Sequence, residues 1–200
     1  MIKLIKHNIK LKNKIFLKSS LGNIQLFFID KIFILPKTLQ IYKKNKFLFF
    51  KTSSRILSLQ LINNNFFFIR TNKLLLTCNN KNKKSIINLY TKLIKIKIKG
   101  ILQGFKLTLF LKGIGFKAFI EKNSLILKLG FSHNIIISIP SNIEIINHSN
   151  TLIFSSIDYI FLNQFVHYVK NHKKPEPYKG KGLLFKNEKI LQKEGKKSKK

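Results

Sequence analysis

An internal repeat constrains the fold of this chain more than any other feature of its sequence. A shift of 78 positions lays residues 41–77 on residues 119–155 without a gap, and apolar positions coincide throughout. Turn-forming residues coincide as well, in two pairs: Asn45 with Asn123, and Asn72 with Asn150. Apolar matches alone also arise by chance in such a chain, but agreement at the turns favours two copies of one folded unit.

Each copy contains short segments with an apolar residue at every second position, as in Leu57 to Leu61 and Ile135 to Ile139. Asn and Ser flank these segments, so the pattern predicts short antiparallel strands. A longer apolar run suited to a helix then ends each copy. In the second copy Ser156 or Asp158 can cap this helix, which must end before Pro175.

The helix of the first copy, around residues 84–98, has a mixed pattern. Ile86, Tyr90 and Leu93 have helical spacing, whereas residues 94–99 alternate Ile and Lys as a strand would. The repeat favours a helix here, as does the family resemblance given below, so a helix is predicted. The predicted fold class is α+β, with two tandem duplicated domains, each a small antiparallel sheet packed with one helix, plus basic extended tails.

The charge of the chain is extreme and unevenly distributed. Its 200 residues include 39 Lys and Arg but only 7 Asp and Glu, a formal net charge of +32. Not one acidic residue lies between Lys31 and Ile120, whereas residues 104–169 are nearly balanced. A chain with this charge repels itself, so we expect it to bind a polyanion.

The residue usage indicates a gene in an A/T-rich genome. Only Arg55 and Arg70 are arginines, although arginine is the better phosphate ligand, and the abundant Lys, Asn, Ile and Phe have A/T-rich codons. An organellar genome fits this bias, and an obligate endosymbiont would look the same. The single Cys78 excludes a disulfide framework or thiolate metal site. Neither a transmembrane stretch nor a signal-peptide core is present, so we expect synthesis inside the organelle in which the protein works.

The segment from Lys173 to Gly182 reads KKPEPYKGKG and has the residues of a phosphate-binding strand. Pro175 and Pro177 lock φ and are expected to hold the backbone extended, while the two following glycines let it turn. Tyr178 supplies a stacking ring between ammonium groups, which suits a phosphate backbone and not an apolar core. A solvated charged tail that happens to contain two prolines is the alternative.

The string PEPYKGKG, followed by Leu183, resembles the C-terminal signature of large-subunit ribosomal protein six, the universal L-six family. Residues 111–118, LKGIGFKA, resemble the start of that family's second domain, and residues 129–133, LGFSH, its next fingerprint. Leu35-Pro36 ahead of Leu39-Gln40-Ile41 resembles the opening of its first domain. The resemblance covers about residues 35–185 and implies two tandem sheet-plus-helix domains, in agreement with the repeat.

With this resemblance the chain divides into four parts. They are a basic N-terminal extension (1–34), a first sheet-plus-helix repeat (35–103), a second repeat (104–174) and an extended lysine-rich rRNA-binding tail (175–200). Phe131 is expected to fill the core. The RNA-binding residues implied by the matching motifs are Lys112, Gly113, Gly115, Lys117, His133, Lys173, Lys174, Tyr178, Lys179, Gly180, Lys181 and Gly182.

The resemblance implies a structural constituent of the large ribosomal subunit that binds rRNA near the factor-binding region, at the base of the stalk. The expected partners are large-subunit rRNA and neighbouring ribosomal proteins, with no membrane and no small-molecule substrate. The expected location is the mitochondrial matrix, with a relict plastid as the alternative. A basic protein bound to an anionic membrane surface is the rival function, and it would need one long amphipathic helix with a Lys face.

Other motifs do not support catalysis or cofactor binding. Gly113 to Ala118 fits the dinucleotide pattern G-x-G-x-x-A, but a strand-like segment follows it and no acid lies about 20 residues on. The five histidines lack metal-ligand spacing, and the few carboxylates have no visible partnership. We therefore predict no enzyme, no cofactor and no metal.

Overall fold

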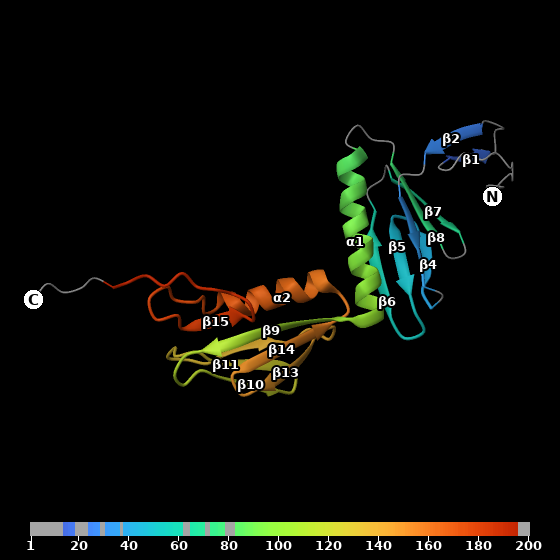
Figure 1. Cartoon of the computed structure of the whole chain (residues 1–200). Helices are drawn as coiled ribbons and strands as arrows, with labels where there is room; N and C mark the ends of the chain where they lie inside the picture. The colour runs from blue at the N-terminus through green and yellow to red at the C-terminus, as the bar shows by residue number, and fades with distance from the viewer. Residues whose placement is uncertain are drawn as a thin grey trace, which may run out of the picture. The chain divides into compact units, whose positions relative to one another are not determined.

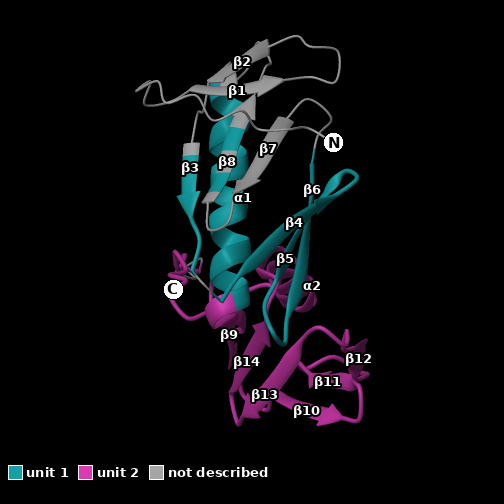
Figure 2. Ribbon diagram, turned by 90° about the vertical axis from the view of Figure 1, so that its right-hand side faces the viewer, with its two compact units in different colours: residues 1–101 teal, residues 102–200 magenta. Residues whose placement is uncertain are grey.

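The computed structural model describes residues 14–18, 24–28, 31–36, 38–61, 65–70, 73–78 and 83–195. The chain forms two compact units, residues 1–101 and residues 102–200, drawn in different colours in Figure 2.

Unit 1 contains two three-stranded antiparallel sheets, one helix and a separate hairpin (Figure 1). One sheet has the order β3-β8-β7, with β3 at Lys31–Ile34, β7 at Asn65–Arg70 and β8 at Lys73–Cys78. The other has the order β4-β5-β6, formed by Gln40–Lys44, Phe47–Lys51 and Ile56–Gln60. The hairpin pairs β1 (Lys14–Lys18) with β2 (Ile24–Phe28), and the helix is α1 (Lys83–Gln103).

Unit 2 has the same kinds of element. Its four-stranded antiparallel sheet has the order β13-β14-β9-β15, formed by Glu144–His148, Thr151–Ser156, Phe105–Lys112 and Gly182–Phe185. Its second sheet has the order β10-β11-β12, formed by Lys117–Glu121, Ser124–Lys128 and Ile135–Ser138. Helix α2 spans Tyr159–Asn171.

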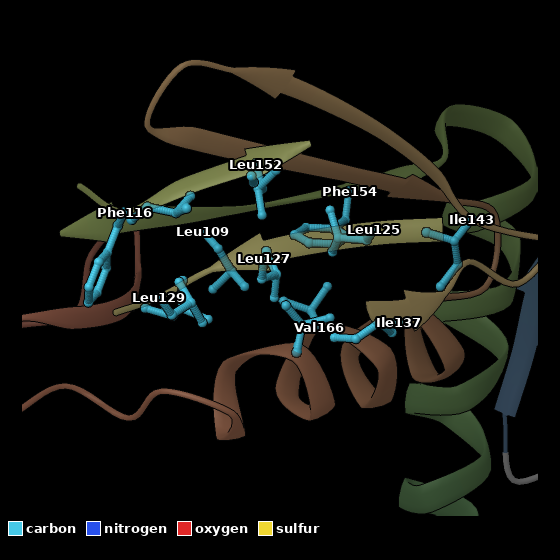
Figure 3. Packing of buried hydrophobic residues seen from close by; sticks show 14 of the residues in the cluster. Leu109, Phe116, Leu125, Leu127, Leu129, Ile137, Ile143, Leu152, Phe154 and Val166 are labelled. Carbon is cyan, nitrogen blue, oxygen red and sulfur yellow. The ribbon is translucent and has the colours of Figure 1, made fainter. Parts of the chain in front are cut away.

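The core of unit 2 lies between its two sheets and α2, where apolar side chains from all three pack together (Figure 3). Leu109 and Phe154 come from the four-stranded sheet, Leu127 from the three-stranded sheet and Val166 from α2, and all four are fully buried. Period-two spacing in the strands and helical spacing in α2 place these residues on facing surfaces.

The predicted duplication is confirmed by the strand order. The sheet β3-β8-β7 corresponds to β9-β14-β13, the sheet β4-β5-β6 corresponds to β10-β11-β12, and a helix follows each set. β15 is an addition to unit 2 that has no counterpart in the described part of unit 1. The predicted α+β class of tandem sheet-plus-helix domains is therefore confirmed, with two small sheets in each unit.

The 78-residue alignment is wrong by one residue in the first hairpin of each unit. Fully buried Leu48 and Phe50 correspond to fully buried Leu125 and Leu127, an offset of 77. The left-handed turn residues have the same offset of 77, since φ is 52° at Asn45 and 50° at Lys122. The offset becomes 78 from β6 to β8, because one more residue lies between the cross-strand partners Leu125 and Ile137 than between the partners Leu48 and Leu59.

The error has a physical cause. Residues 47–50 read Phe-Leu-Phe-Phe, so a slip of one position still matches apolar with apolar. In a strand, however, the same slip exchanges the buried face for the exposed face.

Both predicted helices are confirmed. In α1 the buried positions include Ile87, Tyr90, Ile94 and Ile101, which are spaced by three, four and seven residues as one helical face requires. The alternating Ile and Lys of residues 94–99 therefore lie on a helix and not on a strand. Asp158 caps α2 by accepting a hydrogen bond of 3.1 Å from the Ile160 N–H, and α2 ends at Asn171, before Pro175.

Two segments that the sequence assigned to the basic ends belong to the sheets instead. β3, within the expected extension 1–34, pairs with β8, and β15, within the expected tail 175–200, pairs with β9. In β15 the side chains of Leu183 and Leu184 are buried, and their burial outweighs the charge of the lysines around them. Residues 1–13, 19–23, 29–30 and 196–200 of these ends lie outside the described residues.

The corrected register makes a prediction about stability. Leu48→Ala removes a fully buried side chain and should lower the free energy of unfolding by about 2–5 kcal/mol. Phe47→Ala removes a side chain that is 41% exposed and should lower it by about 1 kcal/mol or less. Chemical denaturation of the full chain measures both changes. The reverse order of effects would restore the 78-residue alignment, in which Phe47 takes the place of Leu125.

Candidate nucleic-acid interface

Three segments of unit 2 meet near the end of β9, and together they hold all of the predicted RNA-binding residues. We call residues 112–117, 129–134 and 172–182 the loop cluster. The Phe116 ring lies 2.8 Å from the position that a Cβ at Gly113 would take and 3.4 Å from that position at Gly130. This ring therefore joins the first two segments (Figure 3), and Lys173 reaches the second with its Nζ 4.4 Å from the centre of the Phe131 ring.

The third segment forms a closed loop and does not run extended as expected. The Leu183 N–H donates to the Lys173 carbonyl at 3.0 Å, which closes the loop at its base. Inside the loop, the Glu176 N–H donates to the Lys181 carbonyl at 2.8 Å, and the Gly180 N–H donates to the Glu176 carbonyl at 2.9 Å. The prolines fix φ locally, but these hydrogen bonds turn the chain back so that β15 can join the sheet.

The two glycines of this loop are structural. Gly182 has a φ of 147°, and a Cβ there would lie 2.6 Å from Pro175 Cα and 2.8 Å from the Lys174 carbonyl oxygen. Gly180 has a φ of 65° and is buried, so both glycines permit close approach within the protein. Neither is available to contact a phosphate group directly. Gly115 differs because it is exposed and has open space around it.

The charged side chains of the loop cluster are mostly exposed to solvent. Lys112, Lys117, Lys174 and Lys179 are exposed, whereas Lys173 and Lys181 are partly buried. Tyr178 is 55% exposed at the tip of the closed loop. The cluster thus presents four exposed ammonium groups and the ring of Tyr178 around a rigid, hydrogen-bonded loop.

Phe131 belongs to this surface and does not fill the core as expected. Its ring is 43% exposed and contacts the Nζ of Lys173. The centre of the His133 ring lies 6.3 Å from that of Phe131, at an interplanar angle of 24°. The loop 129–134 departs from the period-two pattern that predicts burial, and this departure was the signal in the sequence. The exposed His133 therefore has an aromatic neighbour on this surface.

Beyond the loop cluster, Glu188 fastens the C-terminal segment to α2. Its carboxylate accepts hydrogen bonds of 2.6 Å from Lys170 Nζ and 3.0 Å from the Phe185 N–H. The same Nζ lies 4.7 Å from the centre of the Phe185 ring. Partial burial raises the pKa of Glu188, but the two hydrogen bonds and the charge of Lys170 outweigh it and hold the pKa below its usual value of 4.5.

The described residues offer little for other kinds of site. No group of three or more His, Cys, Asp or Glu side chains among them is arranged to hold a metal ion. Neither α1 nor α2 is both long enough and apolar enough to cross a bilayer.

Comparison with known proteins gives the family. The chain is 36% identical over 151 residues to large ribosomal subunit protein uL6 of Dictyoglomus thermophilum, a match that covers 75% of this chain and 81% of that protein. The chain belongs to the uL6 family of large ribosomal subunit proteins. No family model matches it.

Other members of the uL6 family match a shorter part of the chain. It is 40% identical over 121 residues to uL6c of Thalassiosira pseudonana, which covers 60% of this chain and 65% of that protein. It is 40% identical over 126 residues to uL6 of Karelsulcia muelleri, a match that covers 60% of this chain and 69% of that protein. The chain thus matches slightly less than two thirds of the length of the T. pseudonana relative.

The contact between Gly182 and Pro175 predicts a steep cost for any side chain at residue 182. Gly182→Ala should lower the free energy of unfolding by about 2–5 kcal/mol, because the new Cβ clashes with backbone atoms and the φ is unfavourable. Gly115→Ala is the matched control, since it adds only the strain of a positive φ and should cost about 1–2 kcal/mol. Thermal unfolding of both variants compares them. Equal effects would mean that the closed loop is not fixed at residue 182.

The lowered pKa of Glu188 predicts a pH-dependent contribution to stability. A carboxylate whose pKa is lower in the folded state stabilises the fold above the unfolded pKa, and this contribution is lost as the pH falls through the folded pKa. Glu188→Gln should therefore lower the melting temperature at neutral pH, and the difference from the original chain should shrink below pH 4.5. Glu176→Gln, which changes an exposed carboxylate, is the control. A difference that stays constant with pH would contradict the assigned role.

Proposed function

We propose that this chain is a structural constituent of the large ribosomal subunit that binds rRNA through the loop cluster of unit 2. One observation carries the proposal: the matched family motifs, which lie far apart in the sequence, come together in space as one basic, aromatic surface. Phosphate contacts from Lys112, Lys117, Lys174 and Lys179 position the RNA, and Tyr178 stacks on a base or ribose. Neighbouring ribosomal proteins are the other proposed partners, and no catalytic role is proposed.

The rigidity of the loop supports RNA binding more strongly than charge alone. A flexible lysine tail loses side-chain and backbone entropy when RNA orders it. The loop from Lys173 to Leu183 is already closed by three backbone hydrogen bonds, so most of that entropy is lost during folding. The family resemblance supports a finer proposal, in which the bound rRNA lies near the factor-binding region at the stalk base.

We further propose that the protein works in an organellar ribosome, in the mitochondrial matrix, with a relict plastid as the alternative. The A/T-rich residue usage supports this location.

The rival function at an anionic membrane surface needs an amphipathic helix with a free apolar face. The longest helix among the described residues is α1. Its apolar face is already buried in unit 1, at Ile87, Tyr90 and Ile94. This burial argues against binding to a membrane surface.

Salt dependence tests the proposal quantitatively. Each phosphate contact contributes about 0.7–0.9 to the slope of log K against log salt. Replacing Lys112, Lys117, Lys174 and Lys179 together with Gln should flatten this slope by about 3 for a transcript of large-subunit rRNA. Deletion of the whole segment 173–200 is the weaker test, because it also removes β15 from the sheet.

Two further variants make the test specific. Replacing Lys106, Lys122, Lys186 and Lys189 with Gln removes the same charge from exposed positions outside the loop cluster and should change the slope less. Tyr178→Ala should weaken binding by about 1–3 kcal/mol with the slope almost unchanged, because it removes stacking and no charge. If both sets of four lysines flatten the slope equally, binding is non-specific and the loop cluster is not the interface.

A further inference from the structure

The outer face of the β4-β5-β6 sheet in unit 1 carries an exposed aromatic stack that the loop cluster does not explain. Tyr42 and Phe49 are cross-strand partners whose rings are stacked, with centres 5.2 Å apart and an interplanar angle of 11°. The ring of Phe47 lies 6.3 Å from that of Phe49. Tyr42 and Phe47 are each more than 40% exposed, although the opposite face of the same sheet supplies the fully buried Leu48 and Phe50.

This face is basic as well as aromatic. Lys44 is the cross-strand partner of Phe47, and Lys51 lies two residues beyond Phe49 on the same face of β5. Both lysines are exposed, as is Lys46 in the turn between β4 and β5. Not one acidic residue occurs between Lys31 and Ile120, so nothing in the sequence of this sheet offsets the positive charge.

The duplicated fold supplies an internal comparison. In unit 2 the positions of Tyr42 and Phe49 are taken by Phe119 and Ile126, and the positions of Lys44 and Phe47 by Glu121 and Ser124. The equivalent face of β10-β11-β12 thus lacks the stacked pair and has an acid in place of a lysine. That face keeps two exposed lysines, Lys117 and Lys128, so positive charge is common to both units. The aromatic stack is particular to the unit 1 face and does not follow from the fold.

We propose that the outer face of the β4-β5-β6 sheet binds unpaired RNA nucleotides, with bases extending the stack of Tyr42, Phe49 and Phe47 and with Lys44 and Lys51 contacting the adjacent phosphates. Base stacking on aromatic side chains of a sheet is a general mode of single-strand recognition. An apolar protein partner would have no need of the flanking lysines. The proposed site goes beyond the loop cluster, because it lies in the other unit and takes single strands.

Photocrosslinking of the full chain locates the site. The probe is a short, unstructured RNA that carries 4-thiouridine, used at elevated salt where phosphate contacts alone are weak. Mass spectrometry should find the crosslinks within residues 42–51. Crosslinks confined to unit 2 would overturn the proposal.

Affinity measurements with the same probe test stacking itself. Tyr42→Leu keeps an apolar side chain but removes the ring, and should weaken binding by about 5- to 150-fold. Tyr42→Trp should retain the affinity of the original chain. Phe119→Leu, the equivalent change in unit 2, should leave the affinity unchanged. Unchanged binding by Tyr42→Leu, or an equal loss from Phe119→Leu, would overturn the proposal. Either result would favour a protein as the partner of this sheet face.

The two proposals fail separately. Tyr42→Leu should leave the salt slope for the folded rRNA transcript unaltered, since it removes no charge and lies outside the loop cluster. The four-lysine variant of the loop cluster should still crosslink to the short RNA within residues 42–51. The melting temperature of each variant checks that it folds. We expect the Tyr42 variants to melt close to the original chain, because Tyr42 is 42% exposed.

Discussion

The close approach of Gly182 to Pro175 is the constraint on which the arrangement of unit 2 depends. With only 2.6 Å between Pro175 Cα and the position of a Cβ at residue 182, the closed loop can form only around a glycine. That closure brings β15 against β9, and pairing there places Gly182 opposite Lys112. A backbone constraint of a few atoms thereby holds a proline-rich segment beside two loops that come from distant parts of the sequence.

Burial opposes electrostatic repulsion throughout this molecule. A net charge of +32 favours expansion, and few acidic residues are available to offset it. Unit 2 places its apolar side chains in one continuous core. It uses Glu188 to pair Lys170, whose largely buried side chain lies beside the ring of Phe185. Most of the other described lysines of unit 2 are exposed, and an RNA backbone is the partner that would relieve their mutual repulsion.

Much of the fold could be predicted because duplication repeats the same turn and strand signals in both halves. Asp158 and Pro175 bounded α2 correctly, and the repeat correctly outweighed the strand-like alternation of residues 94–99. The register of β5 was missed because four consecutive apolar residues contain no polar marker of the exposed face. The closed loop of residues 173–183 could not be predicted, because a proline fixes only its own φ. The loop depends on hydrogen bonds between residues five or ten positions apart.

The differences between the two units show how one duplicated fold can be adapted to two proposed modes of binding. Counted between cross-strand partners, the connection from β11 to β12 is one residue longer than that from β5 to β6. It carries Gly130, Phe131 and His133, which take part in the loop cluster. Unit 1 has the shorter loop, in which Arg55 donates a 3.1 Å hydrogen bond to the carbonyl of Ile101 in α1 and so serves the fold. Its special residues lie instead on the outer sheet face, at Tyr42 and Phe49. Because strand pairing and core positions are shared, a loop in one unit and a sheet face in the other could change independently of the packing that both units need.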